Sequence, residues 1–166
     1  GLTMPTVRQF MIRRIAEMDA PEAIALLVAR IAASTDVDEQ LALATGLRIG
    51  MQGRRQTTPP EAWPEAFGNM LAAGNAELKM QAVALGVSFG DAAAMARLRN
   101  TIADKEAPLA SRREALESLR RAKDPLLPEV LLDLLDQGTL RRASLAALAQ
   151  YDAPQIPAQV LAVYES

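Results

Sequence analysis

Carboxylates one helical turn apart are the residues with the most evident chemical potential. Glu61 and Glu65 form one such pair, and Glu129 and Asp133 form another. Two carboxylates at this spacing project from the same side of a helix, where they could exchange a proton with a substrate or bind a hard cation. No phosphate-binding glycine loop, serine-nucleophile motif or metal-ligand spacing accompanies them. We therefore predict that they are surface charges, and we assign no catalytic, cofactor-binding or metal-binding residue.

Histidine and cysteine are both missing from the 166 residues. Without cysteine these residues have no thiolate nucleophile, no disulfide and no thioether attachment point for haem. Without histidine they lack the usual general base and the commonest metal ligand. We expect this segment to hold no cofactor and not to be an enzyme.

Five pairs of adjacent arginines are the most distinctive charged feature. A basic stripe of this kind could follow the phosphates of a nucleic acid. Neighbouring residues on a helix point about 100° apart, however, so each pair can also straddle the edge of a solvated face. The net charge of −2 and the pI of about 5.3 favour the second interpretation. The pairs are Arg13–Arg14, Arg54–Arg55, Arg112–Arg113, Arg120–Arg121 and Arg141–Arg142.

The elements that position these residues are predicted to be helices. Hydrophobic residues make up 50% of the chain but aromatic residues only 4%, and no segment alternates in the manner of a strand. Helical patterns of about 12 to 16 residues are separated by short breaks that contain Asp, Pro or Gly. Asp favours the helix N-cap and Pro the first helical turn, so we read each break as a corner between two helices. The breaks are 18–21, 89–91, 123–125 and 151–154.

Small residues recur nine positions before three of the corner aspartates. They are Ala82, Ala115 and Ala143, separated by 33 residues (115 − 82) and 28 residues (143 − 115). This is the period of a two-helix repeat unit. We predict an all-α fold, a right-handed α-α superhelix of about five helix pairs in one domain that spans residues 1–166. The pairs cover about 5–33, 36–75, 76–105, 108–137 and 139–165.

The second pair is irregular. Gly46 and Gly50 share one helical face, which indicates close contact with another helix. The turn that follows allows two interpretations: a capping box from Thr58 to Glu61, or a helix that starts near Pro64. We expect Trp63 to be the anchor that packs this turn.

The second helix of each pair combines an apolar face with a polar one. Its apolar positions include Ile24, Leu27, Val28, Ile31, Met95, Leu98, Ile102, Val130, Leu131, Leu134 and Leu135. Its remaining positions are predicted to form a mildly acidic concave surface, on which a repeat protein binds polypeptide segments. An ordinary solvated surface is the alternative. The surface residues are Glu22, Arg30, Glu61, Glu65, Arg97, Asn100, Glu129, Asp133, Gln155 and Gln159.

The repeat period and the Asp/Pro corners resemble those of the HEAT-repeat (armadillo-like) family. A narrower resemblance, to the HEAT segment of large haem-containing dehydrogenase-like proteins of planctomycete and verrucomicrobial bacteria, rests on four stretches. In that family a propeller domain precedes the repeats and a cytochrome c-type domain follows them. The stretches are Gly46–Gly50 with Pro59–Trp63, Phe89–Asp91, Leu140–Ala143 and Ala149–Asp152.

These resemblances imply a non-catalytic scaffold or protein-interaction module that spaces or docks the domains of a larger protein. The segment would then be extracytoplasmic, and any oxidoreductase activity would belong to the neighbouring domains. The alternative is a nucleic-acid-binding solenoid similar to alkylpurine DNA glycosylases. We expect a protein partner, no membrane span, and apolar surface at both ends that neighbouring domains or self-association would cover. Those ends include Val7, Phe10, Met11, Ile12, Ile15, Val160, Leu161, Val163 and Tyr164.

Overall fold

The computed structural model describes residues 21–52, 57–152, 156–158 and 160–161, and the predicted all-α class is confirmed for them. Helices and their connecting turns account for these residues, which contain no strand. The chain divides into two compact units, Gly1–Ala94 and Met95–Ser166. Among the helices within the described ranges, none combines the length and the apolar character needed to cross a bilayer.

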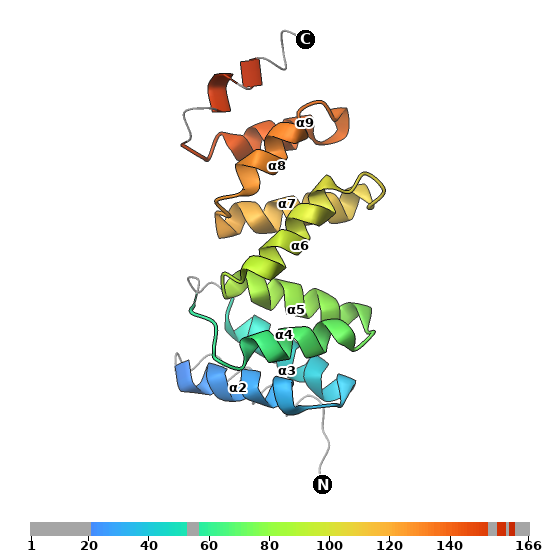
Figure 1. The fold of residues 1–166 in the computed structure, drawn as a ribbon, viewed down its shortest axis with the longest axis vertical. Coiled ribbons are helices and arrows are strands. Elements are labelled where there is room, and N and C mark those ends of the chain that lie inside the picture. Colours follow the sequence, from blue (N-terminus) through green and yellow to red (C-terminus); the bar gives the residue numbers. More distant parts are fainter. Residues whose placement is uncertain (1–20, 53–56, 153–155, 159, 162–166) are drawn as a thin grey trace. The chain divides into compact units, whose positions relative to one another are not determined.

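The first unit is built from two layers of helices (Figure 1). In one layer α2 packs against α4, and in the other α3 packs against α5. Contacts of α2 with α3 and of α4 with α5 join the layers. The bounds are Pro21–Ala33 for α2, Val37–Gly50 for α3, Trp63–Ala72 for α4 and Ala76–Ser88 for α5.

Side-chain caps fix where several of these helices begin. Asp36 accepts from the backbone N–H groups of Asp38 and Glu39 at the start of α3, and Asn75 accepts from that of Leu78 at the start of α5. Asp91 accepts from the N–H of Ala94 at 2.8 Å and so caps α6 (Ala92–Ala103). Each cap satisfies a donor that has no partner within its helix. The prediction that Asp91 marks a corner between helices is therefore confirmed.

The start of α4 decides between the two interpretations of the long turn. The helix begins at Trp63 with Pro64 in its first turn, and Thr58 is not its cap. A helix that began at Pro59 would need an N–H at residue 64 to bond the carbonyl of Pro60, and proline has none. Instead the N–H of Trp63 bonds that carbonyl at 2.9 Å. The capping-box interpretation was wrong, and the helix starting near Pro64 is correct.

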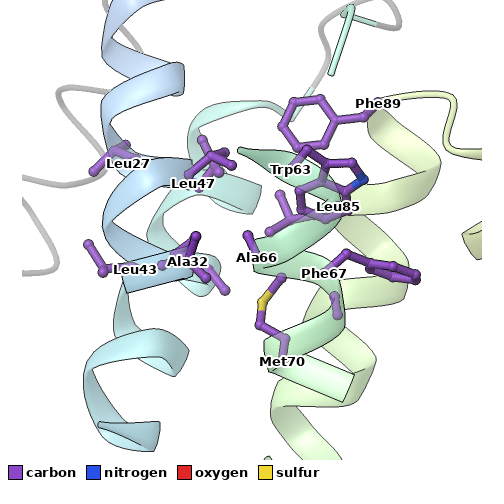
Figure 2. Packing of buried hydrophobic residues seen from close by; sticks show 14 of the residues in the cluster. Leu27, Ala32, Leu43, Leu47, Trp63, Ala66, Phe67, Met70, Leu85 and Phe89 are labelled. Carbon is purple, nitrogen blue, oxygen red and sulfur yellow. The ribbon is translucent and has the colours of Figure 1, made fainter. Parts of the chain in front are cut away.

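The apolar core of the first unit lies between its two layers. All four residues predicted for the inner face of α2, from Ile24 to Ile31, are buried. Gly46 and Gly50 are buried in α3. Figure 2 shows the rings of Trp63, Phe67 and Phe89 gathered beside Leu85, with Ala66 and Met70 further along α4.

The second unit contains α7, α8 and α9, together with most of α6. Its helix α9 packs against both α7 and α8. The core is almost entirely leucine and alanine, with Met95, Ile102 and Ile156. Of the residues predicted for inner faces, Leu98 and Val130 are only half-buried. The bounds are Leu109–Ala122 for α7, Leu127–Asp133 for α8 and Gly138–Leu148 for α9, with further helical residues at 156–158 and 160–161.

One repeated small residue is displaced by one position. Ala82 and Ala115 are buried as expected, but in α9 the fully buried small residue is Ser144 and Ala143 is half-buried. The Ser144 hydroxyl is buried and has no hydrogen-bond partner among the residues that the structure describes. A hydroxyl buried in this way costs free energy because it loses its bonds to water.

Replacing Ser144 by alanine is expected to raise the free energy of unfolding by about 1 kcal/mol, since it removes this hydroxyl and leaves the packing in place. Urea unfolding followed by circular dichroism measures the change. Ser118→Ala in α7 is the matched control, because the Ser118 hydroxyl donates to the carbonyl of Glu114 at 2.9 Å. A loss of stability in Ser144→Ala would contradict the account of Ser144.

Candidate functional site

The sequence placed its candidate residues at the polar positions of the second helices, which are α2 and α4 in the first unit and α6 (Ala92–Ala103) and α8 in the second. Every candidate that the structure describes is solvent-exposed. Gln155 and Gln159 lie outside the described residues. Val7, Phe10, Met11, Ile12, Ile15, Val163 and Tyr164 of the chain ends are also outside them, whereas Val160 is half-buried and Leu161 is exposed. The exposed candidates are Glu22, Arg30, Glu61, Glu65, Arg97, Asn100, Glu129 and Asp133.

In the first unit the exposed side of α2 and α4 has a distinct shape, which we call the α2–α4 face. On α2 it consists of Leu26, Ala29 and Ala33, which lie opposite the buried residues of that helix. On α4 it consists of Gly68 and Ala72, which are likewise exposed. The two helices lie in one layer and are joined by a bond from the Asn69 side chain to the carbonyl of Ala32 at 2.9 Å.

The residues of the α2–α4 face have small side chains, except for Leu26, which is large, apolar and exposed. A Cβ added at Gly68 would meet no atom within 4 Å, so the space above α4 is open. Leu26 is 72% exposed, the most exposed of the large apolar residues described. The carboxylates of Glu61 and Glu65 lie on the exposed side of α4 and of the turn before it. This face therefore offers a shallow apolar strip beside acidic groups.

Arg30 does not act together with the other candidates. Its guanidinium donates bidentate hydrogen bonds to the carboxylate of Glu39 in α3, at distances of 2.9 to 3.0 Å. Glu39 also accepts from the hydroxyl of Ser34 at 2.6 Å. Arg30 thus holds the turn between α2 and α3, which the sequence did not predict because Glu39 lies on the neighbouring helix.

In the pair Arg112–Arg113 the first arginine is buried in the protein and the second is exposed to solvent. Arg112 is only 5% exposed and donates to the carbonyl of Ile102 at 2.8 Å and to the side chain of Gln137 at 2.7 Å. Its neighbour Arg113 is exposed. Ile102 lies in the last turn of α6, where the helix dipole favours a cation. Arg13, Arg14, Arg54 and Arg55 lie outside the described residues.

In the other two described pairs neither arginine is buried, although each pair bonds groups of the protein. Arg120 donates to Glu117 and, at 3.0 Å, to the side chain of Gln150, while Arg121 is exposed and also bonds Glu117. Arg141 and Arg142 are both exposed, and Arg141 donates to the carbonyl of Leu135. The burial of Arg112 was missed because its position, three residues before Ala115, was read only as part of a charged pair.

Two corner aspartates each receive a bond from the second helix of the preceding pair. Asp91 accepts from the indole N–H of Trp63 in α4 at 3.0 Å, and Asp124 accepts from Arg99 in α6 at 2.6 Å. The corner predicted at residues 123–125 is confirmed, because α7 ends at Ala122 and α8 begins at Leu127. Asp124 is not the N-cap of α8, since that position is held by Leu126. Asp124 is 1% exposed, and its carboxylate forms an ion pair with Arg99. A buried carboxylate needs such a partner.

Ion pairs on α7 shift one titration strongly. Hydrogen bonds from Arg120, opposed by partial desolvation and reinforced by bonds from Arg121, lower the pKa of Glu117 from 4.5 to about 2. The pair distances are 2.6 Å to Arg120 and 2.9 Å to Arg121, and Glu117 remains 38% exposed. In the second unit, burial raises the pKa of Tyr151, and the charge of nearby Asp124 adds to the effect.

The lowered pKa of Glu117 predicts a pH-dependent contribution to stability. Because the folded value lies below the unfolded one, the contribution is complete above pH 4.5 and is lost as the pH falls through about 2. We expect Glu117→Gln to be less stable than the parent at neutral pH and equally stable below pH 2. Urea unfolding at a series of pH values measures this difference, and a difference that does not vary with pH would contradict it. Glu114→Gln, at an exposed carboxylate of the same helix, is the control.

The paired carboxylates remain surface groups in the structure. Glu61, Glu65, Glu129 and Asp133 are all exposed to solvent. Within the described ranges, no three Asp, Glu, His or Cys residues come together in a way that could hold a metal ion. Comparisons of the chain with protein-family models, with curated proteins and with solved structures found no match.

Proposed function

We propose that this chain is a HEAT-type helical repeat that serves as a scaffold or protein-interaction module and spaces or docks domains of a larger protein. The proposal rests on the hydrogen bonds that polar side chains form between helices. Within the part of the chain that the structure describes, several of these bonds connect one helix to another. A scaffold needs this kind of cross-bracing between successive repeats.

The bonds that support this proposal join elements that alternate along the chain. In the first layer Asn69 of α4 reaches α2, and in the other Arg48 of α3 donates to Gln81 of α5 at 2.7 Å. In the second unit Arg120 of α7 reaches Gln150, which follows α9. Links of this type hold a helix of one pair beside the equivalent helix of the next pair, as a stack of repeats requires.

The α2–α4 face is the part that we propose to contact a polypeptide. Exposed alanine and glycine allow another backbone to approach closely, and Leu26 supplies apolar area that water covers poorly. The carboxylates of Glu61 and Glu65 would suit basic or amide groups at the edge of such a contact. A neighbouring domain of the same protein or a separate segment could occupy this face.

Hydroxyl-radical footprinting of the full-length protein tests the proposal. Oxidation of Leu26 should be strongly suppressed despite its exposure, while Met80, which is 57% exposed on α5, should stay reactive. Gly68→Arg, which fills the open space above α4, should restore oxidation of Leu26 without changing the helix content. Full reactivity of Leu26 in the unaltered protein would contradict the proposal.

The nucleic-acid alternative predicts a different result in a simple assay. A phosphate-binding solenoid should be retained on double-stranded DNA at low salt and released steeply as salt is added. Our proposal predicts no retention, since Arg112, Arg120 and Arg121 already bond groups of the protein itself. Salt-sensitive retention that is lost in Arg113→Glu/Arg142→Glu would favour the alternative over the scaffold.

A further inference from the structure

We draw no further inference here: the strongest candidate, the outward side of α8 where exposed Leu126 lies near Glu129 and Asp133, is a group of surface carboxylates beside one leucine, and nothing in the structure shows what covers it.

Discussion

Replacement of Trp63 by alanine is expected to lower the free energy of unfolding of the first unit by about 3–5 kcal/mol. The indole is 1% exposed and packs against Phe67 and Phe89, with ring centres 5.4 and 4.8 Å away. It also donates to Asp91, which in turn caps α6. Truncation would leave a cavity between the layers and remove one bond from the cap. Circular dichroism in urea measures the loss, because the variant lacks the only tryptophan of the chain.

Two further variants separate packing from hydrogen bonding at this position. Trp63→Phe keeps a ring in the core but removes the indole N–H, and is expected to cost clearly less than alanine. In Asp91→Asn the amide N–H₂ would meet the indole N–H if the amide oxygen keeps capping Ala94. The loss in the free energy of unfolding of the double variant Trp63→Phe/Asp91→Asn should therefore be smaller than the sum of the losses of the two single variants. Strict additivity would contradict a coupling between the indole N–H and Asp91. A cost below about 1 kcal/mol for Trp63→Ala would show that Trp63 is not the anchor.

A methyl group at Gly86 is expected to destabilise the first unit although it favours the helix. A Cβ at this position would lie 2.4 Å from the Cβ of Ala94 and 3.4 Å from the Trp63 ring. Overpacking of this kind costs about 1–3 kcal/mol, and alanine regains about 1 kcal/mol of helix propensity. We expect Gly86→Ala to lose up to about 2 kcal/mol net, measured by urea unfolding with the fluorescence of Trp63 as the probe.

Gly68→Ala is the matched control for this prediction. Gly68 also lies inside a helix, but its Cβ would enter open space, so the substitution should stabilise the protein by up to about 1 kcal/mol. Adding Ala94→Gly to Gly86→Ala should recover part of the lost stability, because it removes the Cβ atom of residue 94 with which the new methyl group would clash. If Gly86→Ala and Gly68→Ala change stability by the same amount, the close approach of α5 and α6 is not as described.

Much of the fold follows from local rules that the sequence displays. The 3.6-residue spacing of apolar residues places the inner face of α2 correctly, and Asp91 marks a true corner because capping depends only on nearby backbone groups. Local rules fail where a distant side chain competes. Asp124 also stands at a corner between two helices, yet its carboxylate pairs with Arg99 and α8 begins three residues later. Spacing along one helix contains no information about a partner 25 residues away.

In the candidate site too, local spacing predicts some features and contacts between helices determine the others. Helical spacing correctly places Glu65, Arg97 and Glu129 on exposed sides, since exposure follows from the direction of the apolar face. It did not select the most exposed apolar side chain, Leu26, which interrupts an otherwise small or polar surface. Nor did it indicate that Arg30 is held by Glu39 of the next helix. Those features depend on how α2 and α3 are packed, which no single helix specifies.

Photo-crosslinking from Gly68 in the full-length protein tests the proposed scaffold role most directly. A photoreactive side chain fits at Gly68 because the space above it is open, and the same group at exposed Lys79 of α5 is the control. We predict crosslinks from Gly68 to a neighbouring domain or a bound polypeptide, identified by mass spectrometry, at a yield well above that from Lys79. Equal yields at the two positions, or no crosslink from Gly68, would contradict the account.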